Sequence, residues 1–138
     1  MWAMSLRISR QHIDQLLHYA ELALPNECCG LLFGDDKHIA ALTWTQNVSK
    51  TPPTHFEIDP AALIAAERNS RGAKIGLIGY FHSHPNGHCR PSQIDAEMAV
   101  KDGRFWLIIA NHGVSAWRAV QNGALHQTFD PVELDSTD

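Results

Sequence analysis

Residues 78–95, IGYFHSHPNGHCRPSQID, bring three of the chain's nine histidines together with a cysteine and an aspartate. His82 and His84 are two residues apart, so in a β-strand both imidazoles point to the same face. Asp95 lies three residues after Ser92, and residues at this spacing are neighbours on one face of a helix. Two imidazole nitrogens and one carboxylate oxygen are the protein ligands of a hydrolytic zinc site that keeps a fourth position for water.

Each part of this pattern also has an explanation without metal. An H-x-H can be the polar end of an edge strand, and S-x-x-D before an apolar stretch is a capping box that needs no chemistry. All four residues nevertheless fall at one junction, where a buried strand ends and a helix begins, which is the usual position of sites on open sheets. The sequence therefore favours a metal site here. His88 and Cys89 lie in the spacer, and we interpret them as loop residues.

The segments on either side of this junction predict the strand and the helix. AKIGLIGYFHSH, residues 73–84, is an almost continuous apolar run, typical of a strand buried on both faces in the middle of a sheet. Pro85 ends it, because proline cannot donate to the ladder. QIDAEMAVKD, residues 93–102, is then predicted to form a short helix that begins near Ser92 and ends at Gly103.

Two further helices are predicted from helical periodicity. Ser9 is expected to cap a helix over residues 10–24 that Pro25 stops. Asp59 followed by proline is expected to begin a second helix that continues to Gly72.

The other segments predict strands and loops. Short runs bounded by turn formers indicate strands at CCGLLFG, HIAALTWTQ, RFWLIIAN, VSAWRAVQ and ALHQTF. Turns are expected at residues 34–36 and, as a hairpin, at residues 121–123. NVSKTPPTHFEI is too rich in proline and polar groups for an interior strand and is expected to form a loop or an edge segment. The order α-β-β-α-β-α-β-β-β describes an α/β (α+β) fold, a mixed β-sheet flanked by helices.

Length and composition limit the classes of protein. A chain of 138 residues with 44% hydrophobic and 19% charged residues fits one domain, residues 1–138. Its apolar runs are far shorter than the roughly 18 residues that cross a bilayer, so no membrane is expected as a partner. The net charge is −4, the pI is about 6.1, and the eleven basic residues are scattered, so nucleic acid is not expected either.

The cysteines indicate the compartment. Cys28, Cys29 and Cys89 are odd in number and contain no C-x-x-C, which argues against a disulfide framework and a four-thiolate zinc site. The first residues, MWAMSLRISRQHID, lack the apolar region of a secretory signal. The protein is therefore expected in the cytoplasm. The adjacent cysteines begin a strand and are expected to be small buried side chains.

These residues resemble the signature of the JAMM (MPN-plus) zinc metallopeptidases, which is a glutamate upstream, then H-x-H, seven residues, S, two residues and D. HSH at 82–84, the spacer PNGHCRP, Ser92, QI and Asp95 match it completely. PNECCGLLFG around Glu27 and FEIDP at 56–60 are similar to segments of small stand-alone bacterial members. The resemblance spans residues 24–120 and implies a JAB/MPN-like (cytidine-deaminase-like) single domain.

By this resemblance His82, His84 and Asp95 bind Zn²⁺, Glu27 is the general base and the Ser92 side chain stabilises the oxyanion. Zinc lowers the pKa of its water to about 7 and polarises a carbonyl group. Glu27 is then expected to pass a proton to the departing amine. Spacing alone does not bring Glu27 to the histidines, and the same ligand set accepts iron or cobalt.

The resemblance also implies a substrate. Members of the family hydrolyse peptide or isopeptide bonds next to the carboxyl-terminal tail of ubiquitin or ubiquitin-like proteins. Small bacterial relatives occur beside sulfur-carrier proteins of ubiquitin-like fold, so a carrier with a Gly-Gly tail is the expected partner. As a further hypothesis, the loop SKTPPTHFEI pairs with this extended tail by strand addition.

Three other functions are weighed against this one. A catalytically silent MPN-type interaction module usually lacks a histidine, the serine or the aspartate, and none is missing here. A zinc deaminase needs H-x-E followed by P-C-x-x-C, whereas this chain has H-x-H at the junction and no C-x-x-C. A cysteine peptidase using Cys28 or Cys29 leaves the H-x-H spacing unexplained. Peptide and isopeptide bonds, and the oligomeric state, are left open.

Overall fold

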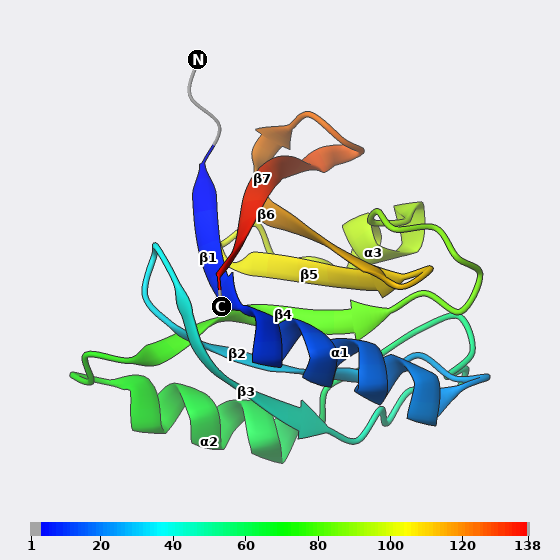
Figure 1. Ribbon diagram of the computed structural model, residues 1–138, viewed down its shortest axis with the longest axis horizontal. Helices are drawn as coiled ribbons and strands as arrows, with labels where there is room; N and C mark the ends of the chain where they lie inside the picture. The colour runs from blue at the N-terminus through cyan, green and yellow to red at the C-terminus, as the bar shows by residue number, and fades with distance from the viewer. Residues whose placement is uncertain (1–3, 138) are drawn as a thin grey trace.

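The computed structural model describes residues 4–137, and within them the chain forms one mixed sheet with three helices (Figure 1). The strand order is β1-β7-β6-β5-β4-β2-β3. The strands are β1 (Ser5–Ser9), β2 (Cys29–Gly34), β3 (Ile39–Thr45), β4 (Gly76–Ser83), β5 (Phe105–Ala110), β6 (Gly113–Gly123) and β7 (Gln127–Thr137). The helices are α1 (Arg10–Ala23), α2 (Pro60–Ser70) and α3 (Gln93–Met98). The predicted mixed sheet flanked by helices is confirmed.

β4 lies in the middle of the sheet, between β2 and β5, as its apolar run predicted. It is parallel to β5, with His82 opposite Ile108, and antiparallel to β2, with His82 opposite Cys29. Phe81 and His82 are completely buried. A polar ring therefore lies at a fixed, completely buried position in an interior strand.

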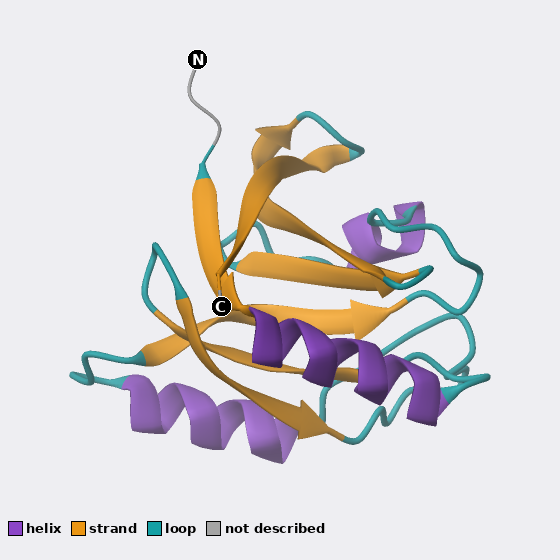
Figure 2. Ribbon diagram, viewed as in Figure 1, coloured by secondary structure: helices purple, strands orange, loops and turns teal. Residues whose placement is uncertain are grey.

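Helices cover both faces of this sheet. Leu16 and Leu17 of α1 pack with Phe81 and Leu107 in one core cluster. Ala66 of α2 packs with Trp106 and other residues in a second cluster. Figure 2 shows α1 in front of the sheet, with α2 and α3 behind it. The two sides of β4 thus have different surroundings.

The predicted helix starts are confirmed by their caps. The Ser9 hydroxyl accepts a hydrogen bond from His12 N at 3.1 Å, and the Asp59 carboxylate accepts one from Ala61 N at 3.0 Å. α1 ends at Ala23, just before Pro25, and α2 ends at Ser70, before Gly72 in a left-handed conformation. Local sequence was sufficient because each cap bonds to a backbone group two or three residues away.

Several features differ from the prediction, among them the strand predicted at ALHQTF, residues 124–129, which lies at Gln127–Thr137 instead. α3 ends at Met98 instead of residue 102, and Val100, two residues later, is 71% exposed and finds no core. The predicted turn at 121–123 lies within β6, and the chain turns after Gly123 instead. β1 was not predicted; it pairs in parallel with β7, with Ser5 opposite Glu133. Pairing across more than 120 residues leaves no local signal.

The segment between β3 and α2 is the loop that its prolines predicted. Its pairing is limited to one isolated bridge between Asn47 and Ile58. Within residues 4–137, no helix combines the length and the apolar character needed to cross a membrane.

Candidate active site and metal centre

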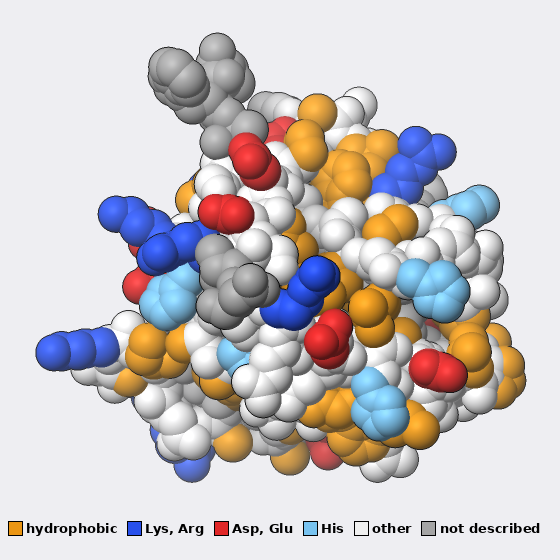
Figure 3. Space-filling view, in the orientation of Figure 1, with side chains coloured by type: hydrophobic (Ala, Val, Ile, Leu, Met, Phe, Trp, Pro, Cys, Tyr) orange, Lys and Arg blue, Asp and Glu red, His pale blue; other side chains and the backbone are white. Residues whose placement is uncertain are grey.

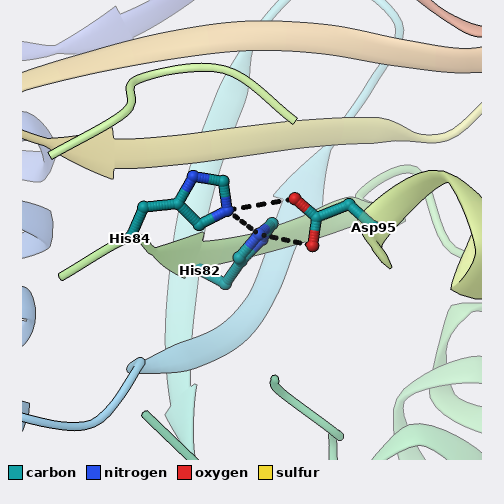
Figure 4. Close-up of side chains that lie close together, drawn as sticks. All are labelled: His82, His84 and Asp95. Carbon is teal, nitrogen blue, oxygen red and sulfur yellow. Dashed lines mark hydrogen bonds and ion pairs between the residues drawn. The ribbon is translucent and has the colours of Figure 1, made fainter. Parts of the chain in front are cut away.

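The predicted ligands His82, His84 and Asp95 meet at the carboxyl end of β4 (Figure 4). His82 Nε2 lies 3.1 Å from His84 Nε2 and 3.2 Å from Asp95 Oδ1, and His84 Nε2 lies 3.0 Å from Asp95 Oδ2. All three residues are at least 95% buried. Zinc ligands lie about 2.0–2.2 Å from the ion, so atoms sharing one tetrahedral ion are separated by roughly 3.3 Å. The spacing of the three atoms fits such a centre.

The hydrogen bonds of His84 show why a cation belongs between these atoms. His84 Nδ1 donates to the His88 carbonyl at 2.7 Å, and this bond assigns the ring proton of a neutral imidazole to Nδ1. His84 Nε2 then carries a lone pair, yet it faces an Asp95 carboxylate oxygen and the second imidazole. Convergent lone pairs repel unless a proton or a metal ion lies among them. Neutral imidazoles and a carboxylate are ligands that suit Zn²⁺.

Asp95 serves as a helix cap and as a candidate ligand at once. The Ser92 hydroxyl accepts a hydrogen bond from Asp95 N at 3.0 Å, and Asp95 Oδ2 accepts one from Ser92 N at 2.9 Å. The capping box that would explain Ser92 and Asp95 without a metal is therefore present. It fixes the carboxylate so that its two oxygens face His82 and His84, which makes the two explanations compatible.

The charges at this cluster shift the pKa values of its members. Burial lowers the pKa of His82, and the nearby Asp95 only partly opposes this. Burial would also lower the pKa of His84, but the hydrogen bond and charge of Asp95 outweigh it and raise the pKa. Burial would raise the pKa of Asp95, yet the two histidines hold it well below its usual range. Asp95 is thus an ionised carboxylate, as a metal ligand must be.

Glu27 reaches the cluster through the register of β2 and β4. Cys29 is opposite His82 in this antiparallel pair, and Ser83 N donates to the Cys28 carbonyl at 3.1 Å. Glu27, one residue earlier, is 95% buried, and its Oε1 has no hydrogen-bond partner within the described residues. Burial raises the pKa of Glu27 to about 8, with His84 lowering and Asp95 raising it. A buried carboxyl without a partner is free to exchange a proton.

The backbone of Glu27 is held from both sides by the loop before α2. Glu27 N donates to the Pro52 carbonyl at 2.8 Å, and the Asn47 side chain donates to the Glu27 carbonyl at 3.0 Å. The same Asn47 amide donates to the His55 carbonyl at 2.9 Å and accepts from Glu57 N at 3.1 Å. Sequence reasoning missed Asn47, since a single asparagine in a loop carries no pattern.

Phe56, in the same loop, covers His82. The two rings are stacked, with centroids 4.2 Å apart, and Trp106 meets His82 edge-on at 5.6 Å. His82 Nδ1 is buried and has no hydrogen-bond partner within residues 4–137. Aromatic packing therefore orients this imidazole, where metal-binding histidines usually rely on a hydrogen bond.

The spacer between His84 and Ser92 is fastened through its carbonyl groups. Asn111 donates to Gly87, Ser115 donates to Cys89, and His126 Nε2 lies 3.1 Å from the Pro91 carbonyl oxygen. None of these three was singled out by the sequence, because each comes from β6 or a turn beside it and has no nearby motif.

The cysteines and His88 lie outside the metal cluster, as expected. Cys28 and Cys29 are free and almost completely buried, and burial raises the pKa of each thiol to about 11. A thiol at this pKa is protonated at neutral pH, which disfavours a cysteine nucleophile. The Cys89 thiol donates to the Ile108 carbonyl at 3.5 Å, and His88 faces the cluster through its backbone carbonyl.

Comparison with known proteins gives the family. The model of a family described as prokaryotic homologs of the JAB domain matches residues 9–120 of this chain. This match covers most of the chain and contains the whole cluster, so the protein belongs to that family.

Relatives and solved structures agree with this assignment. The chain is 32% identical to a desampylase of Haloferax volcanii over 64% of this chain and 66% of that protein. It is 30% identical to a probable TtuB-protein conjugate cleaving protease of Thermus thermophilus over 67% of this chain and 62% of that protein. The match thus spans slightly less than two thirds of each of these two relatives. The solution structure of a Desulfitobacterium hafniense protein superposes with a TM-score of 0.80 at 26% identity, covering 96% of this chain and 93% of the other.

Proposed function

We propose that this protein is a zinc-dependent peptidase or isopeptidase that hydrolyses the amide bond after the Gly-Gly tail of a ubiquitin-like sulfur-carrier protein. The observation that carries the proposal is the unpartnered, buried carboxyl of Glu27 beside the convergent His82, His84 and Asp95. Family membership and the names of its relatives, a desampylase and a conjugate-cleaving protease, support the substrate class.

The metal would be held by His82 Nε2, His84 Nε2 and the Asp95 carboxylate. When bound, Zn²⁺ supplies a Lewis acid for the scissile carbonyl and lowers the pKa of water. The Asp95 capping box, the hydrogen bond from His84 to the His88 carbonyl and the Phe56 stack hold these ligands in place. Pre-positioned ligands of this kind lose little entropy when the ion binds.

Glu27 moves the proton in this mechanism. Its free Oε1 takes a proton from the attacking water and passes it to the departing amine nitrogen. A carboxyl with a pKa raised by burial holds a proton more firmly than an exposed glutamate, so it serves both as base and as acid near neutral pH. A bound cation lowers this pKa again through its charge.

Ser92 acts on the negative charge that develops on the substrate oxygen. Its hydroxyl oxygen already accepts a hydrogen bond from Asp95 N at 3.0 Å, so the hydroxyl proton is directed elsewhere. A donor placed where charge develops stabilises the tetrahedral intermediate more than the planar amide.

The extended tail is proposed to bind beside the loop of residues 47–58 by strand addition. Phe56 itself is buried against His82, so its role is at the metal cluster, and substituting it does not isolate tail binding. We also propose one domain over residues 1–138, because one sheet joins β1 to β7. The free thiols of Cys28, Cys29 and Cys89 support a reducing, cytoplasmic setting.

A fusion of a ubiquitin-like carrier, ending in Gly-Gly, to a short extension tests the function. We expect zinc-loaded protein to cleave after Gly-Gly and a chelator to stop it. Glu27→Gln should lower kcat by at least about 100-fold while it retains zinc. Glu97→Gln, at an exposed position on α3, is the matched control. Full activity of Glu27→Gln would contradict the assigned role of the carboxyl.

A further inference from the structure

A groove lies next to the metal cluster, on the α1 side of the sheet. It encloses about 360 Å³ and is formed by the end of α1, the end of β4 and the turn between β5 and β6. Its walls include Leu17, Ala20, Leu24 and Ile109, with His84 and His112 among its polar residues. This volume falls within the range of sites that bind small ligands or peptide segments, roughly 300–1,000 Å³.

The groove is continuous with the cluster because His84 belongs to both. It lies on the opposite side of the sheet from the loop that holds Glu27. Leu17, Ala20 and Ile109 pack with the core cluster of α1, whereas Phe56 packs with the cluster of α2. A substrate whose scissile carbonyl lies at His84 therefore meets two different surfaces of the protein. One is the groove beside α1, and the other is the loop of residues 47–58.

The groove has an apolar rim that is exposed to solvent. Leu24 is 57% exposed although it follows α1 directly and lines the groove. Figure 3 shows hydrophobic side chains at the surface around the carboxyl-terminal half of α1. An exposed apolar rim beside a catalytic cluster gains stability when an apolar side chain of a partner covers it.

We propose that this groove binds the first two or three residues after the scissile bond, with a large aliphatic or aromatic side chain against Leu24 and Ala20. An extended segment of this length spans roughly 7–11 Å. The Gly-Gly tail occupies the other side, beside the loop of residues 47–58. This inference rests on the proposed hydrolysis and adds a preference for the polypeptide that is released.

Two fusion substrates separate this inference from the proposed function. Both carry the same Gly-Gly-ended carrier; one is extended by a single glycine and the other by a leucine-containing hexapeptide. We expect kcat/KM for the hexapeptide to exceed that for glycine by about tenfold, which is typical of one apolar side chain in a pocket. If neither substrate is cleaved, the proposed function fails; if both are cleaved equally well, only the groove assignment fails.

Variants at the groove sharpen this test. Leu24→Ser should lower kcat/KM for the hexapeptide about tenfold and leave the glycine substrate unchanged, because the side chain is exposed and contributes little to the fold. Ala20→Phe, which fills the groove, should have the same selective effect. Leu22→Ser is the matched control, since Leu22 is 70% exposed on α1 but does not line the groove. An equal loss on both substrates in the groove variants would overturn the assignment.

Discussion

The chemistry of the site depends on where its protons lie. They are distributed over four side chains, those of Glu27, His82, His84 and Asp95. Asp95 is held ionised by the two histidines, and the His88 carbonyl keeps the His84 ring proton on Nδ1. Glu27 differs from them, because no described group donates to its Oε1 and burial raises its pKa to about 8. In metal-free protein near neutral pH, the ionised form of Glu27 is therefore the destabilised one.

This gives a prediction about the pH dependence of stability. The pKa of Glu27 in the folded, metal-free protein is about 8, above its ordinary value of 4.5. The folded state therefore binds more protons between these values, and stability falls as pH rises through them. Glu27→Gln removes this loss, so at pH 9 the metal-free variant should be roughly 2–4 kcal/mol more stable than the parent, and below pH 4.5 nearly equal to it.

Urea unfolding of both proteins, freed of metal with a chelator, measures the difference at several pH values. Glu97→Gln should follow the parent throughout, since its side chain is exposed. A constant difference between Glu27→Gln and the parent from pH 4 to pH 9 would show that Glu27 titrates normally.

At the scale of secondary-structure elements, the loop between β3 and α2 connects Glu27, the proposed base, to His82, a proposed ligand. Asn47 and Pro52 hold the backbone of Glu27, and Phe56, nine residues after Asn47, stacks on His82. The Glu27 carboxyl lacks a partner at Oε1, so its place depends on its backbone more than on side-chain bonds. The loop thus positions the Glu27 carboxyl that we propose as the general base.

Asn47→Ala should therefore lower kcat by about 10- to 100-fold, change KM little and keep about one zinc per chain. The Glu27 and His55 carbonyls lose their donor, which displaces the base, while the ligands on β4 and α3 keep their own support. Steady-state kinetics together with elemental analysis test this. Asn69→Ala, at an exposed position on α2, should behave like the parent. Loss of zinc in Asn47→Ala would instead indicate a general structural role.

At the scale of the whole molecule, the metal connects β4 to α3. The chain itself connects these two elements only through the loop between Ser83 and Gln93. His82 and His84 belong to β4 and its end, and Asp95 belongs to α3, a helix of only six residues. A ligand that binds only the folded state stabilises it by mass action. Zinc should therefore stabilise the docking of α3 against the sheet as well as supply chemistry.

The Tm of metal-free protein should be roughly 5–15 °C lower than the Tm of protein in free zinc at about 100 times the Kd. This range follows from the stabilisation by a bound ligand and from the size of the domain. Calorimetry with and without a chelator measures this shift. His84→Ala should show no zinc-dependent shift. His88→Ala should shift like the parent, because His88 contributes its backbone carbonyl and its side chain is exposed. An unchanged Tm in zinc-loaded parent protein would contradict a structural contribution of the metal.

The sequence by itself determined the features that depend on local geometry. The H-x-H pair on a buried strand, the capping box that carries Asp95 and the caps at Ser9 and Asp59 follow from spacings of two or three residues. Strand and helix periodicities fix such arrangements whatever the rest of the fold does.

Only the tertiary structure decided which distant residues join this core of the site. The register of β2 against β4 places Glu27 beside His84, and loop packing brings Asn47 and Phe56 to them. The parallel pairing of β1 with β7 and the groove beside α1 also come from long-range packing. Contacts across tens of residues are chosen by the free energy of the whole fold, and a single sequence carries no local pattern that records them.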